Sequence, residues 1–147
     1  MQQRPTLGLP SISRDANFLK ALPALFQECW RRETSYDPEK WSPENPTHGQ
    51  CAITALVIQD LLGGDLLRGK VNGADHYWNR LPDSSEFDLT RDQFGEAVSV
   101  TPPERVSRQY VLSFENTVRR YEKLSHLFKS ALKEISTTKL IDFNRSD

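Results

Sequence analysis

The chain has 147 residues, of which 37% are hydrophobic and 27% are charged, and this composition indicates a folded domain rather than a disordered chain. Its 19 basic and 20 acidic residues leave a formal net charge of −1, which argues against a dedicated nucleic-acid-binding protein. No apolar run reaches about 18 residues and no secretory signal is recognisable, so we expect a cytoplasmic protein without a membrane span.

Residues 1–14 contain two prolines and a glycine with little periodicity, and they predict an extended arm before one domain that spans residues 15–147. A helix is predicted to end at about Arg32, because apolar residues recur at spacings of three and four before it. Two starts are open: Asp15 as the N-cap, or Pro23 as the first helical residue.

The most apolar segment predicts a helix from about Gln50 to Leu62, after a proline-rich loop that runs from Thr34 to Gly49. Apolar residues cover nearly the whole circumference of this helix, which is typical of a helix in the middle of a domain. The pair Gly63-Gly64 follows and predicts its end.

Three short extended segments predict a small, largely antiparallel sheet, at residues 65–71, 76–81 and 86–90. Asn72-Gly73 predicts the first turn, and a turn with Pro82 at its second position joins the other two segments. Residues 105–112 predict either a strand or the start of a helix, and residues 115–135 predict a closing helix. The order of elements predicts an α+β fold, with a central buried helix packed on the sheet and flanked by helices.

Three side chains of this central region form a candidate catalytic set, namely Cys51, His76 and Asp88. Cys51 opens the central helix, where the helix dipole and unpaired N–H groups stabilise a thiolate. A hairpin centred on residues 82 and 83 would place His76 opposite Asp88 within about one residue, so that the carboxylate can orient the imidazole. A nucleophilic triad has this logic: the thiol attacks, the imidazole transfers the proton and the acid orients the imidazole.

A site of this type also needs donors that stabilise an oxyanion near the thiol. Besides the Cys51 backbone N–H, the candidate donors are the side chains of Gln50, Asn45 and Trp41. Trp78 shares the strand face of His76 by alternation, so it is interpreted either as a core residue or as a wall of a substrate pocket. Asn79 is expected to hydrogen-bond either in the hairpin or in the site.

A zinc site is a weaker alternative, in which His48 would complete a Cys-His-His-Asp set with the three candidate residues. The sequence has no closely spaced ligand pair, so we expect no metal. Cys29 falls on the apolar stripe of the first helix and is expected to be structural. The basic residues of the closing helix are expected to form a solvated face; they are Arg119, Arg120, Lys123, Lys129 and Lys133.

The same residues carry a family resemblance. Cys51 at the start of a buried helix, followed by HYWN at residues 76–79 and FDLT at residues 87–90, resembles the core of the transglutaminase-like and papain-like cysteine superfamily. More narrowly, the segment of about residues 28–95 resembles the bacterial YunG-like family, and the closing helix does so more weakly. The resemblance implies a cysteine-proteinase-like fold with a candidate triad of Cys51, His76 and Asp88.

The chain departs from the papain-like proteases in two respects. It lacks their Cys-Gly-Ser-Cys-Trp run, and Gln50 lies immediately before Cys51, whereas those proteases keep a glutamine several residues earlier. The chain is also short, with little room for a second lobe that would form a substrate cleft. These departures argue against protein cleavage more than against the fold.

The first hypothesis is a cysteine-dependent acyl-transfer enzyme, without a cofactor, that acts as a hydrolase, deamidase or transferase. Its substrate would be a small-molecule or peptide amide, or a thioester. The alternative is a non-catalytic binding or accessory module of the same fold, which would tolerate loss of the Cys51 thiol. We expect no nucleic-acid or membrane partner, and the sequence leaves the oligomeric state open.

Overall fold

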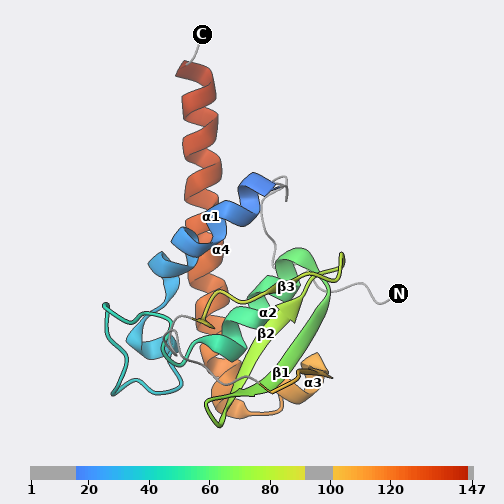
Figure 1. Ribbon diagram of the computed structural model, residues 1–147. Coiled ribbons are helices and arrows are strands. Elements are labelled where there is room, and N and C mark those ends of the chain that lie inside the picture. Colours follow the sequence, from blue (N-terminus) through green and yellow to red (C-terminus); the bar gives the residue numbers. More distant parts are fainter. Residues whose placement is uncertain (1–15, 92–100, 146–147) are drawn as a thin grey trace.

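The computed structural model describes residues 16–91 and 101–145, and it describes side chains as far as residue 135 (Figure 1). The extended arm predicted for residues 1–14 lies outside this part of the chain. The elements in order are α1 (Ala16–Cys29), the 3-10 helix η1 (Arg32–Thr34), α2 (Cys51–Leu62), β1 (Asp65–Val71), β2 (Ala74–Arg80), β3 (Glu86–Phe87), β4 (Glu104–Val106), α3 (Arg108–Val111) and α4 (Glu115–Arg145). The predicted α+β class is confirmed.

α1 contains Pro23 in its interior, so the alternative in which the helix begins at this proline is wrong. Pro23 is exposed, and the hydrogen bond that it cannot donate is therefore missing on the solvent side of the helix. The helix ends at Cys29, earlier than predicted, and the chain then passes through η1 into the loop before α2.

α2 is the central element, as predicted. Eight of its residues are buried, and Figure 1 shows it between the sheet and α4. Its far end is anchored by a partly buried ion pair in which Arg108 Nη2 lies 2.9 Å from Asp60 Oδ1. Arg108 also donates to Tyr121 Oη at 2.7 Å, so α2, α3 and α4 are linked by polar contacts as well as by packing.

The sheet is antiparallel with the order β3-β2-β1-β4. Asn72 and Gly73 have φ of 51° and 84°, which is the conformation of the predicted two-residue turn between β1 and β2. β3 is shorter than predicted because the side chain of Asp88 turns the chain: its Oδ1 accepts from Thr90 N at 3.2 Å. The segment 105–112 provides both expected alternatives in succession, the end of β4 and then α3.

The register between β2 and β3 differs from the predicted one. Asn79 pairs with Phe87, and extending this register by one residue places Asp88 opposite Trp78 rather than opposite His76. The offset from the predicted partner is two residues, which leaves the side chains on the same face of the sheet.

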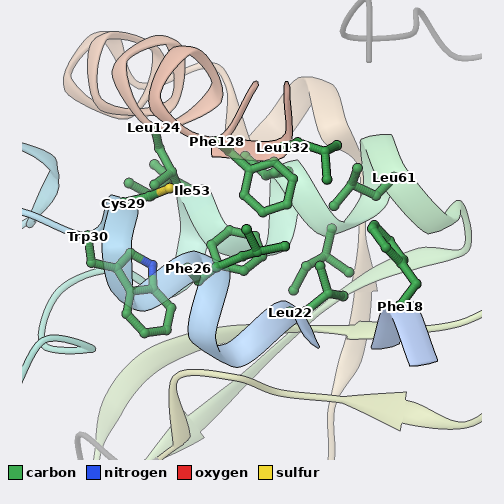
Figure 2. Packing of buried hydrophobic residues seen from close by; sticks show 13 residues of the cluster. Phe18, Leu22, Phe26, Cys29, Trp30, Ile53, Leu61, Leu124, Phe128 and Leu132 are labelled. Atoms are coloured by element: carbon green, nitrogen blue, oxygen red, sulfur yellow. The ribbon is translucent and has the colours of Figure 1, made fainter. Parts of the chain in front are cut away.

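The largest hydrophobic cluster lies between α1, α2 and α4 (Figure 2). The rings of Phe26 and Phe128 meet there at a centroid distance of 4.7 Å. A second cluster lies between α2, β1 and α3, and it includes Leu56, Leu66 and Val111. The two clusters cover opposite sides of α2, which explains why its sequence is apolar nearly all round.

α4 runs to Arg145, well beyond the predicted end at residue 135, and Figure 1 shows its last turns projecting past the other elements. No helix in the described part of the chain combines the length and the apolar character that a membrane crossing requires.

Candidate active site

Cys51 is the first residue of α2, and its side chain is half-buried. The loop before it is held closely against the helix start, since Tyr36 N donates to Gly49 O at 2.8 Å. Gly49 has a φ of +73°, and a Cβ at this position would lie 2.8 Å from Tyr36 N and also overlap Ser35 Oγ. A glycine is therefore required two residues before the cysteine.

His76 and Asp88, the other two candidate residues, are in direct contact. His76 Nε2 donates to Asp88 Oδ2 at 2.7 Å, and His76 is fully buried. Arg91 Nε donates to the same carboxylate oxygen at 2.8 Å. The carboxylate is thus held by neighbours in its own loop as well as by the imidazole.

The Cys51 thiol is the second side chain that is hydrogen-bonded to the imidazole. Burial lowers the pKa of His76, but hydrogen bonds to Asp88 and to Cys51, together with their charges, outweigh burial and raise it to about 9. Burial opposes ionisation of Asp88 as well, yet His76 and Arg91 hold the pKa of this carboxyl below its usual range. The structure therefore favours an imidazolium–carboxylate pair beside the thiol.

Trp78 and Asn79 follow His76 on β2 and lie on opposite faces of the strand. Trp78 is buried, stacks on the imidazole of His76 at a centroid distance of 5.5 Å, and donates from Nε1 to Glu86 Oε1 at 2.6 Å. Asn79 Nδ2 donates to Ala55 O of α2 at 2.9 Å. Trp78 therefore fixes the imidazole plane, whereas Asn79 fixes the distance between β2 and α2.

The three predicted oxyanion donors are engaged to different degrees. Gln50 is fully buried and its Nε2 donates to Arg31 O at 3.0 Å, so its amide ties the helix start to the chain after α1. The indole N–H of Trp41 donates to Pro46 O at 2.9 Å and is used inside the loop. Asn45 is half-buried, and its backbone N donates to Ser42 O at 3.0 Å.

His48 does not join the other candidate residues. Its Nε2 lies 3.2 Å from Asp37 Oδ2, in a hydrogen bond within the loop. Among the described residues, no group of three or more His, Cys, Asp or Glu side chains is arranged to hold a metal ion.

Two arginines, Arg91 and Arg120, make contacts that the sequence did not predict. Arg91 bonds Asp88 and also lies over the Trp78 ring, with its Cζ 5.3 Å from the ring centroid. Arg120 is buried at 2% exposure, so its assignment to a solvated face of the closing helix is wrong. The short separation of Arg91 and Asp88 in the sequence could have predicted their contact. Arg120 lies far along the chain from the loop that it contacts, so the sequence provided no comparable indication.

The family model described as YunG protein matches residues 18–133. The chain belongs to the YunG family. It is 37% identical over 70 residues to the protein YunG of Bacillus subtilis (strain 168). The aligned region covers 48% of this chain and 57% of the Bacillus protein, so the chain spans little more than half the length of that relative. No solved structure matches this YunG-family chain.

Proposed function

We propose that this YunG-family protein is a cysteine-dependent acyl-transfer enzyme with a cysteine-proteinase-like fold, related to the transglutaminase-like and papain-like superfamily. One observation carries the proposal: Cys51, at the start of the buried helix α2, is hydrogen-bonded to His76, and His76 Nε2 donates to Asp88 Oδ2 at 2.7 Å. A nucleophile, a base and an orienting acid in this relation form the unit required for acyl transfer.

In the proposed reaction, Cys51 Sγ attacks the carbonyl carbon of an amide or thioester and forms a C–S bond. The imidazolium of His76 donates its proton to the leaving amine or thiol as the C–N or C–S bond of the substrate breaks. His76, now neutral, then takes a proton from water or an amine acceptor that attacks the thioester intermediate. The acyl group leaves with the acceptor, and Cys51 returns to its thiolate.

The charge state of the contact supports this role. Burial opposes the protonated form of His76, but Asp88 and Cys51 raise its pKa to about 9, so the imidazolium is present at neutral pH. An imidazolium next to a thiol stabilises the thiolate, which is the reactive form. The backbone N–H of Cys51, at the positive end of the α2 dipole, is the first candidate donor to an oxyanion.

The burial pattern limits the substrate. His76 is fully buried and Cys51 is half-buried, so a reacting carbonyl meets the sulfur before the imidazole. This arrangement suits a slender acyl group on an amide or thioester, such as a small molecule or an extended peptide side chain.

The test is the pH dependence of Cys51 alkylation in a Cys29→Ser background, with and without His76→Ala. Cys29 is removed for clarity, although burial and the nearby Glu28 already raise its pKa to about 11. We expect wild-type Cys51 to react with a midpoint well below about 8.5, the value of a free thiol. We also expect His76→Ala to raise that midpoint. An unreactive Cys51 at every pH where the protein is folded would contradict the proposal.

A non-catalytic binding module is the second candidate, and the complete burial of His76 favours it. In such a module, the hydrogen bonds from Cys51 through His76 to Asp88 would join α2 to the hairpin and have no catalytic role. An acyl-trapping substrate library separates the two functions. If the protein is an enzyme, the wild type forms a covalent adduct with a member of the library and folded Cys51→Ala forms none. If the protein is a binding module, neither protein forms an adduct.

A further inference from the structure

Arg120 lies on α4, nearly 70 residues after Cys51, and its guanidinium reaches the loop that leads into α2. Its Nη1 donates to Thr34 O at 3.2 Å and to Gly49 O at 3.4 Å. Gly49 lies two residues before Cys51. Arg120 therefore contacts both ends of the loop that positions the start of α2.

The guanidinium is buried among neutral acceptors. Its Nε donates to Asn116 Oδ1 at 2.6 Å and its Nη2 to Thr117 Oγ1 at 3.5 Å, and the ring of Tyr36 covers it with a Cζ-to-centroid distance of 5.6 Å. In the described part of the chain, no carboxylate forms an ion pair with Arg120. Burial of a cation without a carboxylate partner has a desolvation penalty, so the burial of Arg120 is unfavourable for folding on this count.

The elements that contact α4 near Arg120 also carry charged and titratable groups. Burial lowers the pKa of Arg120. Among the neighbouring groups, Cys51 and Tyr36 favour the charged guanidinium, whereas the positive charge of Arg119 opposes it. In the loop, the side chains of Asp37 and His48 form a hydrogen bond with each other, with His48 Nε2 at 3.2 Å from Asp37 Oδ2. On η1, which packs against α4, the side chains of Arg32 and Glu33 are exposed.

We infer that Arg120 is a positioning residue that holds the loop before Cys51 and places a buried positive charge where it stabilises the Cys51 thiolate. This inference rests on the proposed function and deepens it. His76 acts on the thiol from β2, and Arg120 acts on it from α4. The backbone contact at Gly49 O transmits the position of α4 to the start of α2, and the cation adds to the positive end of the helix dipole.

The two possible roles of Arg120, a purely structural contact and a charge that stabilises the thiolate, lead to different expected results. Loss of a purely structural contact lowers the stability of the protein but leaves the ionisation of Cys51 unchanged. Loss of the charge makes the thiolate less favourable, because a nearby opposite charge favours the ionised form of a titratable group. The pH profile of Cys51 is therefore the readout that distinguishes the two roles.

The experiment measures the rate of Cys51 alkylation by iodoacetamide against pH in the full chain carrying Cys29→Ser. We expect Arg120→Gln to raise the midpoint by about one pH unit or more. Arg119→Gln is the matched control, because Arg119 is the adjacent residue and is exposed, so solvent screens its charge. Arg120→Lys keeps the charge and is expected to keep most of the effect.

Two results overturn the inference. One is a folded Arg120→Gln variant, with a normal circular dichroism spectrum, whose midpoint equals that of wild type. The other applies if Arg120→Gln does not fold: a folded Arg120→Met variant, which keeps an unbranched side chain without the charge, whose midpoint equals that of wild type.

The same measurements separate this inference from the proposed function. If His76→Ala raises the midpoint and Arg120→Gln does not, the role of Arg120 is wrong and the proposed function stands. If wild-type Cys51 already titrates like a free thiol and neither variant moves its midpoint, the proposed function fails together with the inference.

Discussion

Asp88 Oδ2 lies 2.7 Å from His76 Nε2, although the register of the hairpin places Asp88 opposite Trp78. The contact forms because the strand ends at Phe87 and the chain turns at Asp88, with Thr90 N donating to Asp88 Oδ1 at 3.2 Å. The offset of two residues keeps the carboxylate on the face of His76. A turn in the chain, and not strand pairing, therefore brings the two side chains together.

This contact makes stability depend on pH in a defined direction. Burial lowers the pKa of His76, but Asp88 and Cys51 raise it from 6.5 to about 9. The unfolded chain releases the proton at lower pH, so the stabilisation is fully present below pH 6.5 and is lost as the pH rises through about 9. Urea unfolding across this window is expected to show a loss of about 3 kcal/mol. The loss should be absent in His76→Gln, and an equal loss in that variant would assign it to other groups.

Asp88→Asn tests whether the carboxylate controls the reactivity of Cys51. The neutral amide no longer stabilises the imidazolium, so the pKa of His76 falls and the thiolate loses its partner. We expect the alkylation midpoint of Cys51 to rise by about one pH unit. Asp83→Asn is the control, because Asp83 is exposed in the same hairpin and its carboxylate accepts from Ser85 N at 2.9 Å. Equal shifts in the two variants would contradict a specific role of Asp88.

Gly49→Ala is expected to disturb the start of α2. The added Cβ must adopt a φ of +73° and would lie 2.8 Å from Tyr36 N, so we expect a loss of about 3 kcal/mol in the free energy of unfolding. Gly73→Ala has a similar φ of +84° but nothing within 4 Å of its Cβ, and we expect a loss of about 1 kcal/mol. Chemical denaturation checks the order, and a larger loss in Gly73→Ala would refute the steric argument.

Phe128→Ala tests the packing of α1, α2 and α4. Phe128 is fully buried and meets Phe26 at 4.7 Å, so its truncation leaves a cavity and is expected to cost about 3–5 kcal/mol. Phe114 is 51% exposed, and Phe114→Ala is expected to cost less than about 1 kcal/mol. The comparison by thermal or urea unfolding fails if the two variants lose equal stability.

Local sequence patterns determined most of the elements. The all-round apolar segment before Gly63 predicted a central helix, because such a helix is stable only when other elements cover it. Asn72-Gly73 predicted the turn between β1 and β2, because both residues tolerate the positive φ that the turn requires. The predicted length of β3 failed because a side chain competed with the backbone pattern: Asp88 Oδ1 accepts from Thr90 N and ends the strand early.

The candidate site also has features that the sequence predicted and features that only the tertiary structure determined. Residue types and their order along the chain were enough to select Cys51, His76 and Asp88 as candidates, because a thiol, an imidazole and a carboxylate are the groups that a nucleophilic triad requires. The burial of Arg120 and its bond to Gly49 O were decided by the tertiary structure alone, since α4 and the loop are remote in sequence. Helical periodicity shows which residues share a face, but the packing of α4 against η1 and α2 determines which part of that face is covered.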